Sequence, residues 1–403
     1  MSRWGLGVIG AVVLCAASAS AEPYLAMREG QKCSACHVNM TGGGMRTSFV
    51  SAHAKEILRY PNWFEPLTKP TDPFTGDINQ YVGIGADLRV DMTAVMQDNP
   101  RPDGTVDNNV AFRGTLDEFD INVNQATGYL NVNLIPDLLN FYLDQRFAPS
   151  LDTREVWAMA LLPYDVYLKA GKMFLPYGLQ LQDDNAFIRG GRNGSATTGF
   201  SFNVSQPAFE IGWEPGPISF AASASQGIVD DRDVQGTGTT YALFDDVPVI
   251  SSFLLGQSWT YAGTSDGSNA WVGGFTGFNL GPFFYEGINL GTFTYLGEVD
   301  WGFFNLVDPI TNQRVKPGAF ITYSEANYLF FDWLNMKVAF DYADYDGSLP
   351  RQGSDAENRV SVGFEPFLAR FLQTRFFYRC SNGIETNPSH NQDLWIFELH
   401  AFF

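Results

Sequence analysis

Basic residues are scarce in this chain of 403 residues. Lysine and arginine number 25 against 44 acidic residues, which gives a formal net charge of −19 at neutral pH. A chain with this balance repels nucleic acid and anionic membrane surfaces. We therefore exclude nucleic-acid partners and expect cationic ones, either metal ions or basic proteins.

Long apolar runs are missing after the first twenty residues. Arg3 precedes an uncharged apolar run over 4–17, and Ala19-Ser20-Ala21 provides the small residues of a signal-peptidase site. The run is too short for a comfortable membrane anchor, so we expect residues 1–21 to be a cleaved export signal. No later stretch is long and apolar enough for a membrane helix. A chain with 34 phenylalanines and 40 glycines but no helical span is instead a candidate for a β-barrel.

Cysteine is also scarce, and two of the four cysteines stand in one pentapeptide, Cys33-Ser34-Ala35-Cys36-His37. The Cys-x-x-Cys-His pattern is the attachment signature of a c-type haem. Two thiols at this spacing form thioethers with one porphyrin, and the histidine ligates its iron. A redox pair would belong to a thioredoxin-like βαβ unit, and a zinc site would need a second ligand pair nearby. Neither follows, so we expect one covalent haem c held by Cys33, Cys36 and His37.

The second axial ligand of the iron is open between a histidine and three methionines. Gly42-Gly43-Gly44 predicts a tight turn, a close approach to a flat ligand or a flexible link. A helix is predicted over 47–60, and its expected stripe is Phe49, Ala52, His53, Ile57 and Tyr60. If the chain folds back at the glycines, this helix presents His53 to the iron, and we favour His53 as the second metal ligand. The alternatives are thioethers, which raise the reduction potential, from Met27, Met40 and Met45.

The haem unit with its linker is expected over 22–76. Four prolines, Pro61, Pro66, Pro70 and Pro73, mark an extended linker at its end. A unit this small cannot bury a core of its own, so the haem should serve as much of the core.

From Ile78 onward the hydrophobic period changes to two. Over 82–94 apolar residues alternate with glycines and with charged residues such as Asp87 and Arg89. One lipid-like face and one polar face are typical of a transmembrane strand. The final strand places apolar residues on one face and ends on Phe403, as bacterial outer-membrane barrels do. Its Glu398 and His400 should face the lumen, where Arg375 and Arg379 could pair with them.

Connections between these strands alternate in length. Short turns are predicted at 135–137, 163–165, 214–217, 281–282, 332–333 and 365–366. Longer loops are predicted near 97–116, 178–198, 228–238, 306–316, 345–357 and 381–391. Short turns should face the periplasm, and both chain ends should lie there, which requires an even number of strands. Interpreting 283–304 as one strand with an irregular start gives sixteen, and 239–268 is the weakest part of this count. We thus predict an all-β membrane protein, an antiparallel transmembrane β-barrel over 77–403 whose lumen is plugged by the helical haem unit.

The combination resembles the fused outer-membrane monohaem cytochrome–porins of iron-oxidising bacteria. The match covers Pro23 to Cys33 and continues through His37, whereas Val38 to Met45 differs from the family. The resemblance implies that Cys33 and Cys36 bind haem and that His37 is its proximal ligand. A second segment, Lys169 to Gly178, looks like the end of a strand in phosphate-selective-type porins.

These patterns predict electron transfer across the bacterial outer membrane, with the haem unit entering from the periplasmic side. Extracellular Fe(II) would be the donor and a periplasmic cytochrome the acceptor, without a separate catalytic acid, base or nucleophile. Acidic loop residues could gather Fe(II): Asp183, Asp184, Asp230, Asp231 and Asp233. Two alternatives stay open. One is a conduit that delivers electrons outward. The other is a haem-gated or redox-sensing solute porin, with lumen residues Asp87, Arg89, Asp144 and Lys169 setting selectivity.

Overall fold

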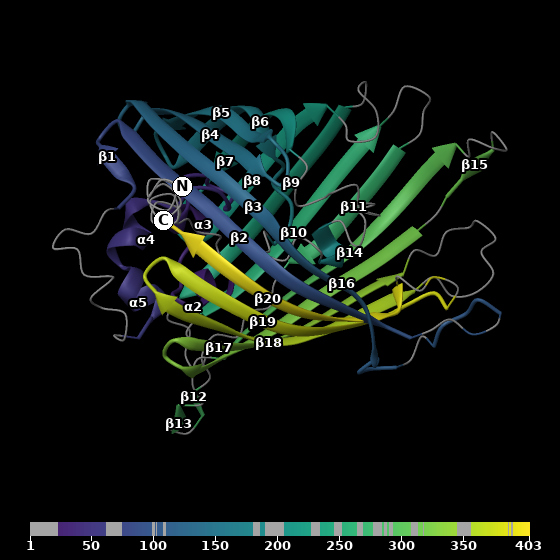
Figure 1. Cartoon of the computed structure of the whole chain (residues 1–403). Helices are drawn as coiled ribbons and strands as arrows, with labels where there is room; N and C mark the ends of the chain where they lie inside the picture. The colour runs from purple at the N-terminus through teal and green to yellow at the C-terminus, as the bar shows by residue number, and fades with distance from the viewer. Residues whose placement is uncertain are drawn as a thin grey trace, which may run out of the picture.

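The structure is a computed structural model of the whole chain (Figure 1). It describes residues 23–61, 75–98, 101, 103–107, 110–179, 186–189, 205–226, 234–245, 252–263, 269–276, 284–285, 288–289, 293–307, 313–316, 318–344, 356–385, 387 and 390–403. Within these ranges, none of the helices has the length and apolar character needed to cross a membrane. The expected signal at 1–21, most of the linker and the five acidic loop residues lie outside the described ranges.

Sixteen long strands among the described residues form one closed barrel. Each pairs antiparallel with the next along the chain, and β2 pairs with β20 to close the wall. The strands are β2 (Val82–Gln97), β3 (Thr115–Ile135), β4 (Leu139–Ala148), β5 (Asp152–Leu162), β6 (Val166–Phe174), β7 (Ser205–Trp213), β8 (Ile218–Gln226), β9 (Val234–Asp245), β10 (Ser252–Gly263), β11 (Asn269–Thr276), β14 (Phe293–Val307), β16 (Gly318–Phe331), β17 (Leu334–Asp344), β18 (Glu357–Ala369), β19 (Leu372–Asn382) and β20 (Gln392–Phe402). The predicted fold class is confirmed.

Three further pairings are small. β1 (Asp77–Asn79) extends the start of β2, and β15 (Arg314–Val315) extends β14. β12 (Phe284–Tyr285) and β13 (Ile288–Asn289) pair only with each other. The stretch interpreted as one strand with an irregular start is therefore this short hairpin followed by β14, and the count of sixteen holds. The weak stretch 239–268 contributes the end of β9 and the whole of β10.

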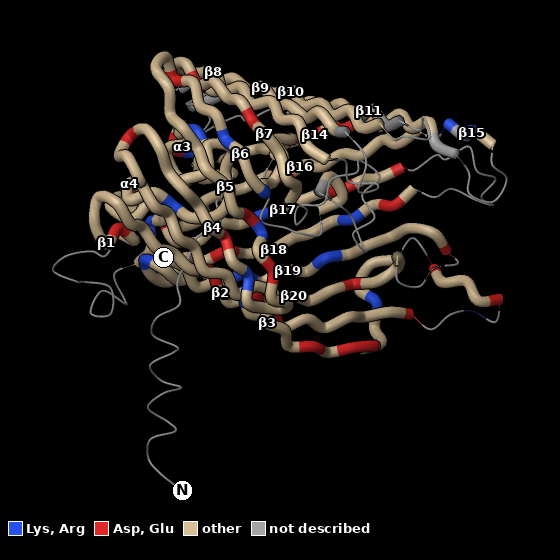
Figure 2. Tube along the Cα trace, turned by 90° about the horizontal axis from the view of Figure 1, so that it is seen from above, with Lys and Arg blue, Asp and Glu red and all other residues tan. Residues whose placement is uncertain are grey.

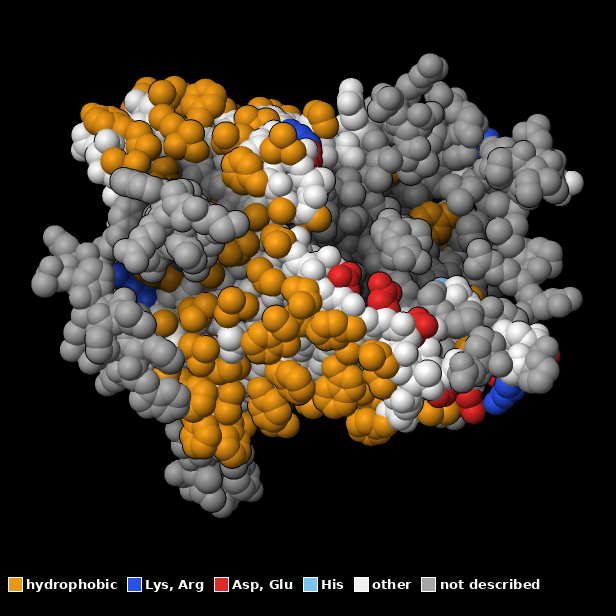
Figure 3. All heavy atoms as spheres, in the orientation of Figure 1, with side chains coloured by type: hydrophobic (Ala, Val, Ile, Leu, Met, Phe, Trp, Pro, Cys, Tyr) orange, Lys and Arg blue, Asp and Glu red, His pale blue; other side chains and the backbone are white. Residues whose placement is uncertain are grey.

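The two faces of the wall differ as the alternation predicted. Along β2 the inward Gly83, Gly85, Asp87 and Arg89 are buried, whereas the intervening apolar residues are partly exposed. Large exposed apolar side chains recur around the outside and cover the described wall in Figure 3. Acidic and basic residues recur along the strands in Figure 2. A barrel that presents its apolar side chains outward needs lipid around it, because water would solvate that surface poorly.

One predicted turn is displaced. Glu365 and Pro366 lie inside β18, and the chain reverses at 370–371 instead. Glu365 is buried in the lumen, where its carboxylate lies 3.0 Å from Lys337 Nζ. Pro366 pairs with Leu334, the first residue of β17, so the donor it lacks falls where that ladder ends. The proline therefore marks the edge of a ladder and not a turn.

The N-terminal unit lies at the end of the barrel that also holds the C-terminus (Figure 1). It consists of α2 (Pro23–Arg28), α3 (Cys33–Cys36), α4 (Ser48–Ala52) and α5 (Ala54–Leu58). The helix expected over 47–60 is thus broken at His53, whose backbone has φ −102° and ψ 17°. The break changes the phase of the second half, and the buried face differs from the predicted stripe: it is Val50, Ser51, Ala54, Ile57 and Leu58.

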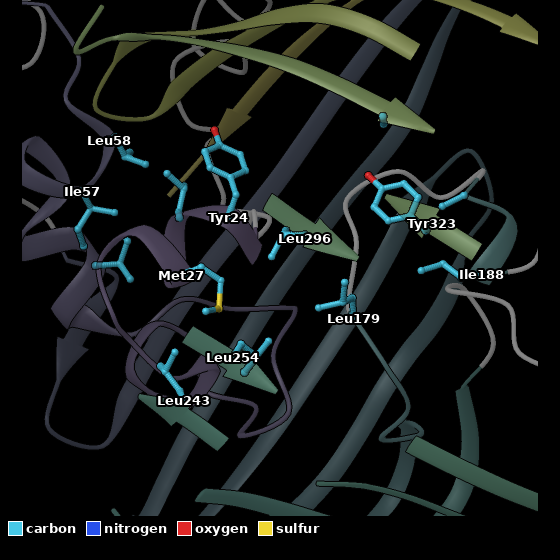
Figure 4. Packing of buried hydrophobic residues seen from close by; sticks show 14 of the residues in the cluster. Tyr24, Met27, Ile57, Leu58, Leu179, Ile188, Leu243, Leu254, Leu296 and Tyr323 are labelled. Atoms are coloured by element: carbon cyan, nitrogen blue, oxygen red, sulfur yellow. The ribbon is translucent and has the colours of Figure 1, made fainter. Parts of the chain in front are cut away.

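The core of this unit is shared with the barrel wall. Met27 and Leu58 pack in one cluster with Leu243 of β9, Leu254 of β10 and Leu296 of β14 (Figure 4). The sequence suggested that a ligand would supply much of the core. The wall supplies part of this core. The N-terminal unit over 23–61, called the plug below, lies inside the lumen and buries its apolar face against the strands.

Candidate functional site

The plug and the wall enclose one large apolar pocket. The empty space within it is about 1100 Å³ when its open mouth is included. Cys33, Cys36 and His37 all line it. The opposite lining comes from Leu179 and from Leu243 and Leu254, which pair across β9 and β10. The structure therefore brings the three motif residues together on the lining of one apolar pocket.

Local backbone structure fixes the motif. Cys33 to Cys36 form a single helical turn, and the His37 amide donates to the Cys33 carbonyl at 2.9 Å. The chain then turns back, so that Val38 N–H donates to the Met45 carbonyl at 3.0 Å. Gly42, Gly43 and Gly44 all have positive φ, of 94°, 78° and 67°. These conformations make the predicted tight turn, and Gly42 and Gly43 also line the pocket, so their close approach to a ligand stays a prediction.

The His37 ring is buried beside the backbone of Gly43 and Gly44. It is 2% exposed, and among the described residues neither nitrogen makes a hydrogen bond of normal geometry. Burial and, to a smaller extent, the Arg46 charge together lower the pKa of His37 to about 3, against the opposing effect of the Gly43 and Gly44 backbone. The ring is therefore neutral at physiological pH, which is the form that ligates a metal.

The two thiols are protonated before any modification. Burial raises the pKa of the Cys33 thiol to about 11. It also raises the pKa of Cys36, against the opposing effect of the Arg46 charge. Two thiols one helical turn apart, a buried, neutral imidazole and an apolar pocket fit a covalent c-type haem. Cys33 and Cys36 would hold it, and His37 would ligate the iron.

His53 does not line this pocket. Its side chain is exposed between α4 and α5, with Nδ1 2.9 Å from the Phe49 carbonyl oxygen and its ring 4.5 Å from the Phe49 ring. Among the alternatives, Met27 lines the pocket, whereas Met40 and Met45 pack in a second cluster around Tyr142 and Trp157.

Polar contacts fasten the plug to the wall. Lys169 Nζ, fully buried on β6, lies 2.8 Å from Glu210 Oε1 and 3.0 Å from the Asn39 side-chain oxygen. The Ser34 hydroxyl donates a hydrogen bond to the Glu214 carboxylate at 2.7 Å, and the Met45 backbone N–H donates to the Tyr142 hydroxyl oxygen at 2.8 Å. Sequence patterns had indicated Lys169 only as a lumen charge. Its contact with Asn39, in the segment after the Cys-x-x-Cys-His motif, could not be predicted because the two residues are 130 positions apart in the sequence.

The other predicted lumen charges are also paired. Asp87 lies 3.5 Å from both Arg89 Nε and His400 Nε2, and Asp144 lies 3.9 Å from Arg154. The expected pair of Arg375 with Glu398 forms at 3.2 Å. Arg379 donates to Ser361 at 3.0 Å.

The connection after β6 enters the lumen. The predicted external loop near 178–198 begins with residues that fold inward: Tyr177 donates to Asp300 at 2.9 Å, and Leu179 N–H donates to Glu298 at 2.6 Å. Farther along, Phe187 N–H donates to Asp341 at 3.0 Å. The described parts of this connection therefore lie against the opposite wall, and Pro176 to Leu179 line the pocket.

We expect Gly44→Ala to destabilise the plug more than Gly43→Ala does. Both glycines have positive φ, so each alanine costs about 1–2 kcal/mol of backbone strain. A Cβ at Gly43 meets nothing within 4 Å, whereas one at Gly44 collides with the Tyr142 hydroxyl. Overpacking adds about 1–3 kcal/mol. The free energies of unfolding of the two variants measure the difference, and equal values would show that Tyr142 does not seat the plug here.

No protein-family model matches the chain, and no curated protein does. Solved structures are similar in fold. OmpT, an outer membrane protein of Vibrio cholerae, has a TM-score of 0.56 at 10% identity, covering 81% of this chain and 99% of its own. The outer membrane channel DcaP of Acinetobacter baumannii has 0.55 at 11%, covering 80% and 97%. Salmonella typhi OmpF, in complex with daunomycin, has 0.54 at 10%, covering 80% and 97%. At these identities the similarity concerns the fold: this chain has a porin-like sixteen-stranded barrel.

Proposed function

We propose that the protein transfers electrons across the bacterial outer membrane through one c-type haem in the plug of the barrel. The observation that carries this proposal is the position of Cys33, Cys36 and His37 on one apolar pocket within the lumen. A haem bound there would supply one-electron chemistry at its iron. Fe(II) reaching the lumen from outside is the proposed donor, and a periplasmic cytochrome the proposed acceptor.

The residues of the chain would set the conditions for this transfer. Cys33 and Cys36 would fix the group covalently, and His37 would bind in its neutral form. Leu179, Leu243 and Leu254 would exclude water from the pocket. Arg46 is buried, and its charge acts on both His37 and Cys36. Arg46 also lines the pocket. A buried positive charge there would stabilise the reduced haem, which carries one positive charge less than the oxidised haem, so the site is suited to accepting electrons.

Stopped-flow reduction of the purified protein by Fe(II) tests the proposal directly. After mixing with Fe(II), we expect the haem absorption to change to that of the reduced form. Adding an oxidised periplasmic-type cytochrome should then reoxidise the haem. A protein that carries haem but is not reduced by Fe(II) would exclude ferrous iron as donor. The alternative, in which the protein delivers electrons outward, would then be tested by measuring haem oxidation by extracellular electron acceptors.

The acidic external residues provide a second test of a cationic donor. Neutralising Asp183, Asp184, Asp230, Asp231 and Asp233 together should slow haem reduction by Fe(II), most clearly at low salt, where exposed charges are least screened.

A matched control for this variant neutralises exposed acidic residues of the short turns at the opposite end, Asp137, Asp165 and Asp332. This control should reduce at the rate of the unsubstituted protein. Equal rates for the two variants at low salt would remove the external loops from the mechanism.

A solute porin is the second candidate, and the porin-like fold favours it. The contacts that fasten the plug to the wall argue against a wide open lumen. Conductance in planar bilayers separates the two functions. A large open conductance supports the porin, and a closed barrel that is reduced by Fe(II) supports the conduit.

A further inference from the structure

Few side chains around the pocket can donate to iron. Among the described residues that line it, His37 is the single histidine and Met27 the single methionine. The other donors are the two motif cysteines, Lys32, Tyr177 and Tyr241. The cysteine sulfurs are needed for attachment, which leaves one thioether, one amine and two phenols besides His37.

The amine and the phenols are poorly suited to bind iron here. Lys32 Nζ donates to the carbonyl groups of Glu214, at 3.1 Å, and Ile218, at 2.7 Å. Tyr177 donates its hydroxyl to Asp300. A tyrosine would also have to bind as phenolate, and an apolar pocket disfavours that charged form. A methionine thioether is neutral and needs no deprotonation.

The backbone brings Met27 close to the motif. Met27 is 5% exposed and lies near the end of α2, six residues before Cys33. Gly30, with φ of 62°, reverses the chain between the two, and its amide donates to the Met27 carbonyl at 3.2 Å. In Figure 4 the Met27 side chain extends toward Leu243 and Leu254, which line the same pocket.

The other sequence candidates point elsewhere. His53 is exposed, and its Nδ1 atom forms a hydrogen bond with the backbone carbonyl of Phe49 in α4. The Met45 methyl group lies against β2, where a Cβ built on Gly83 would come within 2.8 Å of it. Met40 packs against the same cluster as Met45. Ligation by Met40 or Met45 would require these side chains to leave the cluster around Tyr142 and Trp157.

From these contacts we infer that Met27 would be the second residue, together with His37, to ligate the iron of a haem held in this pocket. The inference rests on the proposed haem and names the ligand that completes it. Thioether ligation favours the ferrous state and raises the reduction potential relative to two histidines. It would therefore act in the same direction as the buried Arg46 charge.

The test compares the purified full-length protein with four variants by low-temperature electron paramagnetic resonance, carbon monoxide binding and redox titration. Met27→Leu conserves volume and removes the sulfur, and Met27→His replaces it with a different ligand. Met45→Leu and His53→Ala are the matched controls. Pyridine haemochrome assays measure covalent haem in every sample.

We expect the unsubstituted protein and both controls to be low-spin and closed to carbon monoxide. Met27→Leu should become high-spin when oxidised and bind carbon monoxide when reduced. Met27→His should stay low-spin with a lower potential, which also provides a readout if the leucine variant does not mature. An unchanged spectrum in Met27→Leu, an unchanged potential in Met27→His or a high-spin unsubstituted protein would overturn the assignment. Covalent haem together with such a result would leave the proposed function standing, whereas absence of covalent haem would overturn both.

Discussion

Replacing Cys33 and Cys36 together by alanine is expected to abolish covalent haem while leaving the barrel assembled. Both cysteines line one pocket, and among the described residues Cys380 is the only other cysteine, buried on β19. The strands close through pairings from β2 to β20 that involve neither Cys33 nor Cys36. Haem staining of denatured protein measures attachment, and the heat-dependent gel mobility of the barrel measures assembly.

Cys380→Ala is the control for this experiment. It removes a buried thiol outside the pocket and should keep its haem. If the double variant retained covalent haem at the level of the unsubstituted protein, the assignment of the motif would be wrong. If the double variant did not assemble, the barrel would depend on haem during its maturation.

Lys169→Met is expected to give the second large effect, a loss of about 3–5 kcal/mol of stability, because it leaves the buried Glu210 carboxylate without its cation, although the Tyr167 hydroxyl still donates to it. The same change removes the bond to Asn39 and so loosens the segment after the haem motif. Chemical unfolding in detergent measures the loss, and bilayer conductance shows whether the plug opens.

Lys172→Met is the matched control three residues along β6. Its amine lies 3.4 Å from Asp152, and both side chains are about a third exposed, so the pair contributes about 0–1 kcal/mol. Similar stability losses in the two variants would contradict an anchoring role for Lys169. A change of ion selectivity in Lys169→Met without a loss of stability would favour the solute porin.

Local patterns predicted the wall well. The period-two alternation from Val82 specifies which side chains face lipid, because neighbouring strands must follow the same pleat. The parity argument for 283–304 rests on a different constraint: β2 begins where β20 ends, at one end of the barrel, and this requires an even number of strands. The placement of Cys33, Cys36 and His37 on one surface follows directly from a single helical turn.

Features that depend on distant contacts could not be predicted from the sequence. The inward course of Tyr177 and Leu179 is set by Asp300 and Glu298, more than a hundred residues later. The side chain of His53 does not point where a continuous helix over 47–60 would place it, because the helix breaks at that residue. No periodicity within 47–60 signals such a break, whereas the wall contacts of Val50 and Leu58 can enforce it.

The position of the pocket near one end of the barrel restricts the size of the donor. The lining residues Leu243 and Leu254 lie close to the connection between β9 and β10, at the end where the short turns lie. β16 spans 14 residues, which at about 3.4 Å per residue and a tilt of about 40° corresponds to a wall about 36 Å tall. Under the proposed function, a mineral surface resting on the outer rim could not touch a haem bound in the pocket at the opposite end. Under the proposed function, iron must dissolve and diffuse into the lumen before it is oxidised, and bulky iron chelates should be poorer donors than the aqueous ion.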